Sequence, residues 1–488
     1  MTHELRRTKI IATLGPATDP PDALQRVLAA GVDVVRINFS HGHADEHRGR
    51  FEAVREAARL LGREVAVLGD LGGPKIRVEK FQAGKVDLRA GQTFVLDCRV
   101  DAPPGDETGV GVSYLDLPGD VVAGDILLLD DGLIALRVER VEPPRIHTTV
   151  LTDGVLSNRK GLNKLGGGLS IGALTDKDMA DIKLAVELGM DFIAVSFCRS
   201  AADMERTRDL VRAAGGEAAL VAKIERAEAI ENLAEIIDAS DAVMVARGDL
   251  GVEIGDAELP GLQKKIIREA VLRNRAVITA TQMLQSMVEA PIPTRAEVLD
   301  VANAVIDGTD AVMLSAETAV GRYAERAVAT MARVCSGAER QFEPDPNFEA
   351  VPRDLERTDQ AIAMAAMFLA GHVDVRAIVA LTESGATARW LSRYRSQVPI
   401  FALSRSAPAR RRMAMLRDVF PIDFEAPPGN PQLAARASIS RLHALGLLSE
   451  GDRVIVTTGD HTGALGGTNT LKLLRVGASG IAEGLGEL

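Results

Sequence analysis

Lysine, arginine, carboxylate and hydroxyl side chains recur at the ends of short apolar segments, and together these groups could bind a divalent cation and an anionic substrate. Eight such segments lie at 9–14, 32–39, 65–71, 191–197, 219–225, 242–249, 276–283 and 311–318. The polar residues near their ends are Arg36, Asn38, Ser40, Asp70, Ser196, Lys223, Glu225, Arg247, Asp249, Thr281, Ser315 and Glu317. Since buried barrel strands are normally apolar, polar groups at equivalent depths favour one shared site.

Lys223 and Glu225 close one segment two residues apart, so in a strand both side chains point to the same face. A lone pair of this kind is usually a structural ion pair. Asp249, at the end of the next segment, changes that interpretation, because two carboxylates at adjacent strand ends repel each other unless a cation lies between them. Magnesium favours few protein carboxylates, completed by water and substrate oxygens. We therefore predict that Glu225 and Asp249 bind a divalent metal.

Glycines flank that second carboxylate in the motif 247–251, Arg-Gly-Asp-Leu-Gly. Glycine lets backbone N–H groups approach an anion closely, although an ordinary strand-to-loop turn explains the motif equally well when it is taken alone. Thr281 and Ser315 end the last two segments. Their hydroxyls either cap local backbone groups or relay a proton to or from a reacting carbon through water, and for each residue alone the two interpretations are equally supported.

Two further stretches, 36–41 and 70–77, gather cations, a carboxylate and polar oxygens at the ends of the second and third segments. The cations are Arg36, Lys75 and Arg77. Arginine suits phosphate recognition, whereas the alternative, a surface charge cluster, fits poorly where strands point into a shared mouth. We predict a phosphate-binding role for this side of the site.

Helix-like stretches follow nearly all of the eight segments, which predicts a closed (β/α)8 barrel with its chemistry at the C-terminal ends of the strands. Residues 73–171 lose the helical period and show short alternating runs between Gly and Pro clusters, typical of an inserted β domain that acts as a lid. The polar, proline-containing stretch 341–354 indicates a linker. We expect a barrel domain at 1–72 and 172–342, the lid at 73–171, and an open α/β domain at 343–488.

The bulk composition is that of an ordinary globular protein of about three domains, with 488 residues and a net charge of −11. The negative charge disfavours nucleic acid as a partner. No apolar run is long enough to span a bilayer, and the N-terminus lacks the features of a signal peptide, so we expect a cytoplasmic protein without a membrane partner. The cysteines Cys98, Cys198 and Cys335 have no metal-type spacing.

A strand-to-helix link in the third domain carries hydroxyls and a glycine, at Thr382, Ser384, Gly385 and Thr387. Such groups at a helix N-terminus can bind phosphate, and a plain turn is at least as well supported by the composition. The loop at 459–469 has a similar character.

In order along the chain, TKIIATLGPAT, VVRINFSHG, DLGGPKIRV, AKIERAEAIENL, MVARGDLGVEI, TATQMLQSM and MLSAETAVG closely resemble pyruvate kinase, over nearly the whole barrel. The resemblance implies transfer of a phosphoryl group from phosphoenolpyruvate to ADP, giving pyruvate and ATP, the last step of glycolysis. It also implies Mg²⁺ or Mn²⁺ on Glu225 and Asp249, and a homotetramer.

The resemblance also assigns roles residue by residue. The positions that match substrate-binding residues are Arg36, Lys223, Ala246, Arg247, Gly248, Asp249 and Thr281. The positions that match nucleotide contacts are Asn38, His41, Arg77 and Lys160, the last supplied by the lid. The catalytic positions are Lys223 and Arg36, against the transferring phosphoryl group, with Thr281 and Ser315, which deliver a proton to the enolate carbon through water.

Departures from the family pattern concern a monovalent cation and the effector. Asn38, Ser40 and Asp70 match the family's potassium ligands, but Leu71 replaces a threonine and Lys75 replaces a glutamate. A fixed ammonium can substitute for the free cation, so we predict activity without potassium. Gly172 stands where the family usually has proline. The stretch NKLGGGLS resembles a bacterial subgroup activated by sugar monophosphates or AMP rather than by fructose 1,6-bisphosphate, which predicts such an effector for the third domain, at Thr382, Ser384, Gly385 and Thr387.

Two alternatives stay open at this point. A metal-dependent aldolase or lyase acting on phosphoenolpyruvate or pyruvate shares the Glu–Asp–metal pattern but needs neither the lid nor ADP. A degenerate kinase that only senses metabolites predicts damaged catalytic positions, and Lys223, Glu225, Asp249, Thr281 and Arg36 are all intact.

Overall fold

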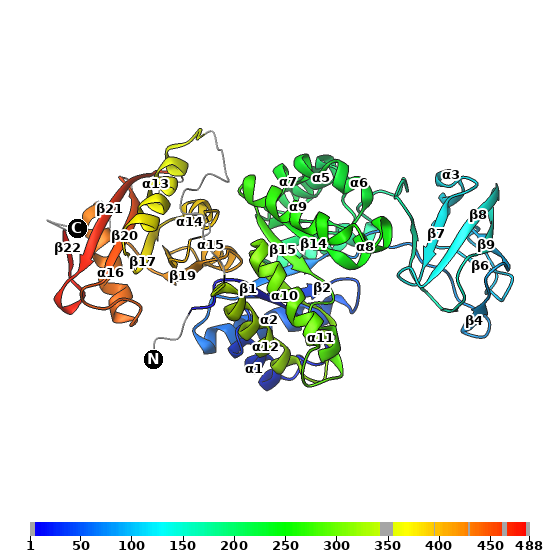
Figure 1. Ribbon diagram of the computed structural model, residues 1–488, viewed down its shortest axis with the longest axis horizontal. Coiled ribbons are helices and arrows are strands. Elements are labelled where there is room, and N and C mark those ends of the chain that lie inside the picture. Colours follow the sequence, from blue (N-terminus) through cyan, green and yellow to red (C-terminus); the bar gives the residue numbers. More distant parts are fainter. Residues whose placement is uncertain (1–4, 342–354, 395, 428–429, 461–465, 485–488) are drawn as a thin grey trace.

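The computed structural model describes residues 5–341, 355–394, 396–427, 430–460 and 466–484. Three units lie in a row, with a barrel between a β-rich unit and the C-terminal α/β unit (Figure 1). Most of the linker predicted at 341–354, and part of the loop at 459–469, lie outside the described residues. No helix of the described chain is long and apolar enough to cross a membrane.

The central unit is a closed parallel barrel, which confirms the predicted fold class. Its strands are β1 (Lys9–Thr13), β2 (Val34–Asn38), β3 (Ala66–Asp70), β12 (Phe192–Val195), β13 (Ala219–Ile224), β14 (Ala242–Ala246), β15 (Ala276–Ala280) and β16 (Ala311–Leu314). They pair in the order β1-β16-β15-β14-β13-β12-β3-β2 and close on themselves. Each lies within the apolar segment expected from the sequence, because buried barrel strands must be apolar on both faces.

Helices follow the strands around the barrel. They are α1 (Pro21–Ala29), α2 (Ala44–Leu61), α4 (Asp176–Leu188), α5 (Ala201–Ala213), α6 (Ala227–Glu231), α7 (Leu233–Asp238), α8 (Arg247–Ile254), α9 (Leu259–Leu272), η1 (Gln285–Val288), α10 (Arg295–Asp307), α11 (Ala316–Ala319) and α12 (Ala324–Glu339). The sequence suggested a strand up to Asp249, but β14 ends at Ala246 and Asp249 lies in the first turn of α8.

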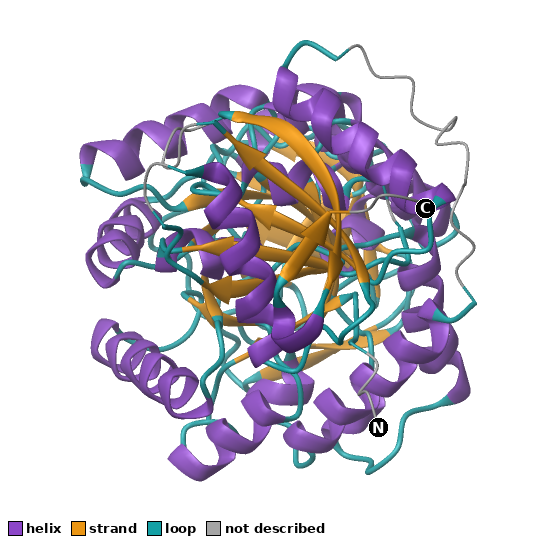
Figure 2. Ribbon diagram, turned by 90° about the vertical axis from the view of Figure 1, so that its left-hand side faces the viewer, coloured by secondary structure: helices purple, strands orange, loops and turns teal. Residues whose placement is uncertain are grey.

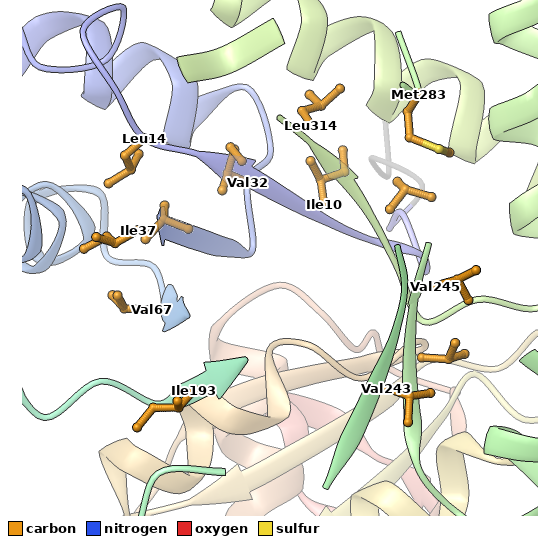
Figure 3. Close-up of a cluster of buried hydrophobic side chains, with 14 of the residues drawn as sticks. Ile10, Leu14, Val32, Ile37, Val67, Ile193, Val243, Val245, Met283 and Leu314 are labelled. Carbon is orange, nitrogen blue, oxygen red and sulfur yellow. The ribbon is translucent and has the colours of Figure 1, made fainter. Parts of the chain in front are cut away.

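Two layers of apolar side chains hold the barrel together. Side chains such as Ile10, Ile37 and Val243 point outward and pack under the helices (Figure 3). Alternate residues, such as Ile11 and Met244, fill the interior. This alternation follows from the two-residue period of a strand, and it leaves the C-terminal strand ends free to carry polar groups.

The β-rich unit is inserted between β3 and α4. It contains β4 (Lys85–Leu88), β5 (Thr93–Asp97), β6 (Gly109–Gly111), α3 (Leu117–Asp120), β7 (Ile126–Leu129), β8 (Ile134–Glu142), β9 (Arg145–Val150), β10 (Gly154–Ser157) and β11 (Leu162–Lys164). Its larger sheet has the order β11-β7-β8-β9-β5-β6. It has its own apolar core, which includes Phe94 and Leu136, and it projects from one end of the barrel (Figure 1).

The C-terminal unit is an open sheet with the order β19-β18-β17-β20-β21-β22. Its elements are α13 (Thr358–His372), β17 (Ala377–Leu381), α14 (Ala386–Ser392), β18 (Ile400–Ser404), α15 (Ala407–Met413), β19 (Val419–Asp423), α16 (Pro431–Ala444), β20 (Arg453–Gly459), β21 (Thr468–Val476), η2 (Ala478–Gly480) and β22 (Ala482–Gly484). Figure 2 looks onto this unit and shows helices around its strands. The edge strands β19 and β22 were not expected from the sequence.

The C-terminal unit packs against the barrel at the N-terminal ends of the strands. One apolar cluster is continuous from the barrel interior, for example Phe192, through to α14 and α15, for example Leu391 and Met413. Ion pairs cross the same junction, and Arg411 Nε lies 2.7 Å from Asp191 Oδ1. The barrel mouth and the C-terminal unit are therefore at opposite ends of the same strands.

Candidate active site

Lys223, near the end of β13, is the centre of a buried polar cluster at the barrel mouth. Its Nζ donates to Ser196 Oγ at 2.7 Å and lies 3.3 Å from Glu225 Oε2 and 3.4 Å from Asp70 Oδ1. Burial alone would lower the pKa of the ammonium, but Asp70 and Glu225 raise it above its usual value. The side chain is therefore a fixed positive charge at neutral pH.

Glu225 follows β13 directly and is fully buried. Its Oε1 accepts the Phe197 N–H at 2.7 Å, while Oε2 has no hydrogen-bond partner among the described residues. Burial raises the pKa of this carboxyl to about 7, the charge of Lys223 opposes the rise, and Asp249 and Asp70 add to it. An additional cation beside Glu225 would therefore stabilise its ionised form.

Arg36 of β2 and Asp70 of β3 form a second ion pair in the mouth, with Arg36 Nε 2.6 Å from Asp70 Oδ2. The same guanidinium donates to Thr13 Oγ1 at 3.2 Å. Burial would raise the pKa of Asp70, but Lys223 and Arg36 together lower it below its usual value. Asp70 thus holds two cations side by side at the place where an anionic substrate would meet the strand ends.

Asp249 begins α8 and is paired with Lys75, whose Nζ lies 3.1 Å from Asp249 Oδ1. The sequence suggested that the Lys75 ammonium joins Asn38, Ser40 and Asp70. Within the described chain Lys75 instead has Asp249 as its ion-pair partner, 174 residues away.

The β14 and β15 ends are tied together by Arg247 and Thr281. Arg247 donates to the carbonyl oxygens of Ala280 and Thr281 and pairs with Asp300 of α10 at 2.7 Å. The Gly248 N–H donates to Thr281 Oγ1 at 2.9 Å, and Thr281 has a positive φ of 69°. The guanidinium of Arg247 is thus engaged in holding this loop, and Ala246 is buried beneath it.

Ser315 follows β16 and is positioned by Glu317. The Ser315 N–H donates to Glu317 Oε2 at 2.7 Å, and Glu317 Oε1 accepts the Leu284 N–H at 3.0 Å. Glu317 is fully buried and links the loops after β15 and β16. Glu317 therefore supports the loops that carry Thr281 and Ser315.

The predicted nucleotide-binding residues divide between the barrel and the lid. Asn38 ends β2 and accepts the Ser40 N–H at 3.0 Å, and Ser40 and His41 are exposed. Lys160 and Arg77 lie on the lid side: Lys160 Nζ is 2.8 Å from Asp130 Oδ1, and Arg77 donates to the Arg159 carbonyl.

The predicted effector residues lie around the start of α14. Thr382 Oγ1 accepts the Gly385 N–H at 3.0 Å, and Gly385 has a φ of 87°. Thr387 is buried, with its hydroxyl 2.7 Å from that of Thr468. Ser384 is exposed.

Glu225 and Asp249 suit a divalent cation, because Glu225 Oε2 is buried without a hydrogen bond and interacts electrostatically with Asp249. No group of three or more His, Cys, Asp or Glu side chains arranged to hold a metal occurs among the described residues. Two carboxylates completed by water and substrate oxygens match the preference of Mg²⁺, so the donor set fits this ion.

Ser196 and Thr13 were given no role from the sequence. Ser196 accepts from Lys223 and donates to the Leu71 carbonyl at 2.7 Å, and Thr13 accepts from Arg36. Both end barrel strands or follow them directly, which is the one sequence signal that could have found them.

These features are those of an enzyme with a charged active site at the mouth of a (β/α)8 barrel, and comparison with known families gives its class. Residues 5–328 match the family model described as pyruvate kinase, barrel domain, and residues 360–474 match pyruvate kinase, alpha/beta domain. The chain belongs to the pyruvate kinase family and is a phosphotransferase.

Relatives align over nearly the full length of the chain. Pyruvate kinase II of Salmonella typhimurium is 53% identical over 480 residues, covering 98% of this chain and 100% of that protein. Pyruvate kinase of Haemophilus influenzae is 52% identical, covering 94% and 97%. The crystal structure of a pyruvate kinase from Cryptosporidium parvum superimposes with a TM-score of 0.90 at 32% identity, covering 96% of each chain.

Proposed function

We propose that the Lys223 cluster is the centre at which this chain transfers the phosphoryl group of phosphoenolpyruvate to ADP, giving pyruvate and ATP. The observation that carries the proposal is the Lys223 ammonium held among Ser196, Glu225 and Asp70 at 2.7–3.4 Å. Phosphoryl transfer needs alignment and charge neutralisation more than covalent chemistry, and a fixed cation at a barrel mouth supplies both.

Lys223 and Arg36 carry the electrostatic part of the reaction. Both hold their positive charge against Asp70, so neither side chain has to reorganise when negative charge develops on the transferring group. The Gly248 N–H and the Thr281 hydroxyl, 2.9 Å apart, together with Ala246 and Arg247, form the wall that would hold the substrate carboxylate.

Glu225 and Asp249 would hold Mg²⁺ or Mn²⁺. When bound, such an ion neutralises phosphate and carboxylate oxygens of the substrates and aligns them. The protein contributes the buried Glu225 carboxylate, anchored by the Phe197 N–H, and the Asp249 carboxylate, which pairs with Lys75.

Loss of the phosphoryl group leaves an enolate that needs a proton. Thr281 and Ser315, on the loops after β15 and β16, are the candidates for delivering it through water. Both loops are held by Glu317 through the Leu284 and Ser315 N–H groups, which keeps the two hydroxyl-bearing segments in register.

ADP would bind on the β2 side, through Asn38 and His41, with Arg77 and Lys160 reaching it from the lid. Closure of the lid over the mouth would exclude water, which otherwise hydrolyses the phosphoryl donor. The domain division that serves this motion is a barrel of 1–72 and 172–342, a lid of 73–171 and a C-terminal domain of 343–488.

Activity without potassium is part of the proposal. The Lys75 ammonium is a permanent cation in the barrel mouth, where it pairs with Asp249. Arg36 and Lys223 form ion pairs with Asp70. With these charges in place, Asn38, Ser40 and Asp70 need no free monovalent cation.

The remaining expectations are a cytoplasmic homotetramer and regulation through the C-terminal domain. The hydroxyls of Thr382, Ser384 and Thr387 with Gly385 would receive a phosphorylated effector, a sugar monophosphate or AMP rather than fructose 1,6-bisphosphate.

The test is pyruvate formation from phosphoenolpyruvate with Mg²⁺, measured with and without ADP and with and without potassium, from a potassium-free and sodium-free baseline. ADP-dependent pyruvate at full rate without potassium is the expected result. Pyruvate that needs no ADP would indicate a lyase instead. A rate that appears only with potassium would keep the kinase and remove the proposed role of Lys75.

A further inference from the structure

A cavity of about 350 Å³ lies between the barrel and the C-terminal unit. Its barrel wall is formed at the starts of β12, β13 and β15 by Phe192, Ala219 and Ala276. Its opposite wall comes from α14 and α15, which lie on the side of the C-terminal unit facing the barrel (Figure 1). The volume is in the range of small-molecule sites.

Arginines dominate the polar lining of this cavity. Arg208, Arg389 and Arg412 reach it, against the acidic Glu217 and Asp241. Asp241 is already engaged, because its Oδ2 accepts from Arg208 at 3.2 Å and from the Leu220 N–H at 2.9 Å. Asp241 therefore pairs with Arg208, and the arginines of the lining outnumber its carboxylates.

Arg412 differs from its neighbours in having no carboxylate partner in the described chain. It ends a row of three arginines on α15. Arg410 pairs with Glu64 at 2.5 Å and Arg411 with Asp191 at 2.7 Å, both across the junction. Arg412 lines the cavity and donates to the Glu217 carbonyl at 3.4 Å.

Arg389 also has an unsatisfied hydrogen-bond donor at this cavity. Its Nε is buried without a hydrogen bond among the described residues, and the guanidinium lies 5.6 Å from the centre of the Trp390 ring. Burial lowers the pKa of this group, and the nearby Arg275 and Arg393 lower it further, while Asp241 opposes them without reversing the shift. A buried donor without a hydrogen bond is unfavourable, and a bound anion would supply the missing acceptor.

We propose that this cavity binds a small phosphate monoester, with Arg389 and Arg412 as its anion-binding residues. Guanidinium groups match phosphate oxygens in geometry and charge, and the apolar wall of Phe192 and Met413 leaves room for the remainder of a sugar or nucleoside. The proposal rests on the effector function proposed for the C-terminal domain and assigns it a pocket. Ser384 and Gly385 of that loop line the cavity, whereas Thr382 and Thr387 do not.

The position of the cavity gives such a ligand access to the active site. The strands that start at its wall are those whose opposite ends carry Lys223 (β13) and Thr281 (β15). A ligand that joins α14 and α15 to these strands would act on the junction between the two units, without entering the barrel mouth.

The experiment is calorimetric titration of the full-length protein with inorganic phosphate, glucose 6-phosphate, ribose 5-phosphate and AMP, with citrate as a carboxylate of comparable charge. The variants are Arg389→Gln and Arg412→Gln. Arg436→Gln, an exposed arginine on α16, is the matched control, and Thr382→Ala reports on the loop outside the cavity. Thermal unfolding checks that each variant is folded.

The expected result is saturable binding of at least one of the phosphate monoesters, with one site per chain. Arg389→Gln and Arg412→Gln each weaken it by about tenfold or more, the loss expected for one charge-assisted hydrogen bond, and Arg436→Gln leaves it unchanged. Binding that is lost in Thr382→Ala but kept in both cavity variants would retain the effector function and overturn the cavity. Citrate binding as tightly as the phosphates would overturn the phosphate assignment, and no binding of any probe would overturn both.

Discussion

The polar side chains at the barrel mouth surround Lys223, and replacing this lysine tests its role in the reaction. In Lys223→Met the buried Asp70 and Glu225 keep their positions but lose a shared counter-ion. We expect kcat to fall by about 10²–10³ or more, the scale for removing a preorganised electrostatic group. Steady-state kinetics measure this, with Lys264→Met, which removes an exposed lysine on α9, as control. A variant retaining more than a tenth of the wild-type kcat would contradict the assigned role.

Ser196 is a positioning residue for that lysine. Its hydroxyl joins Lys223 Nζ to the Leu71 carbonyl, so Ser196→Ala frees the ammonium to move between Asp70 and Glu225. We expect kcat to fall about tenfold with KM for phosphoenolpyruvate nearly unchanged, because the misplacement matters most in the transition state. Ser196→Thr, which keeps the hydroxyl, should restore most of the rate. An equal loss in both variants would indicate a packing defect instead.

At the scale of elements, Asp178 links the two chain crossings between barrel and lid. It closes the capping box of α4 with Thr175, and its Oδ1 also accepts the Gly73 N–H at 3.1 Å. Asp178→Ala should cost about 1 kcal/mol through the lost cap and also loosen both crossings. Glu297→Ala is the matched control, since Glu297 caps α10 in the same way and binds Ser286 instead of a hinge.

Limited proteolysis followed by mass spectrometry distinguishes the two effects. Both variants should melt at lower temperature, but only Asp178→Ala should be cut faster near residue 73 and near 172–175. Equal protection of these crossings in the two variants would show that the Gly73 hydrogen bond does not restrain the lid.

The barrel strands could be predicted because each is a buried apolar run that ends at polar residues. The capping box at Thr175 could be predicted for a similar reason, since cap and partner are three residues apart. The switch from β14 into α8 before Asp249 could not, because Arg247 is held there by carbonyls of the next strand end and by Asp300. The ion pair of Lys75 with Asp249 could not be predicted for the same reason, because long-range packing brings the two residues together and no local sequence pattern indicates it.

At the scale of the whole molecule, the junction between the barrel and the C-terminal unit contains a strained, poorly neutralised carboxylate. Asp418 precedes β19 with a φ of 66°, and neither of its oxygens has a hydrogen bond among the described residues. Burial raises its pKa to about 6, with Glu339 adding to the rise and Arg417, Arg7 and Lys9 opposing it.

This raised pKa makes the free energy of unfolding depend on pH in a definite direction. The folded protein binds a proton at Asp418 more tightly than the unfolded chain, whose pKa is near 3.8, so stability is lost as the pH rises from about 4 through 6. Asp418→Asn keeps the shape and tolerates a positive φ without the charge. It should be more stable than wild type by up to about 3 kcal/mol above pH 7, at about 1.4 kcal/mol per pKa unit.

That advantage should shrink as the pH falls from 6 to 4, because wild-type Asp418 becomes protonated in the folded state. Thermal unfolding midpoints of the two proteins between pH 4 and 8 measure it, and Asp374→Asn, at an exposed carboxylate, should show no such trend. A constant difference across this range, or a less stable Asp418→Asn at pH 8, would mean that Arg7 and Arg417 stabilise the charge more than burial disfavours it. The Asp418 N–H donates to the Arg7 carbonyl at 3.2 Å and so joins β19 to the N-terminal end of the barrel. Under the expected outcome, protonation of Asp418 strengthens the same junction that the proposed phosphate cavity occupies.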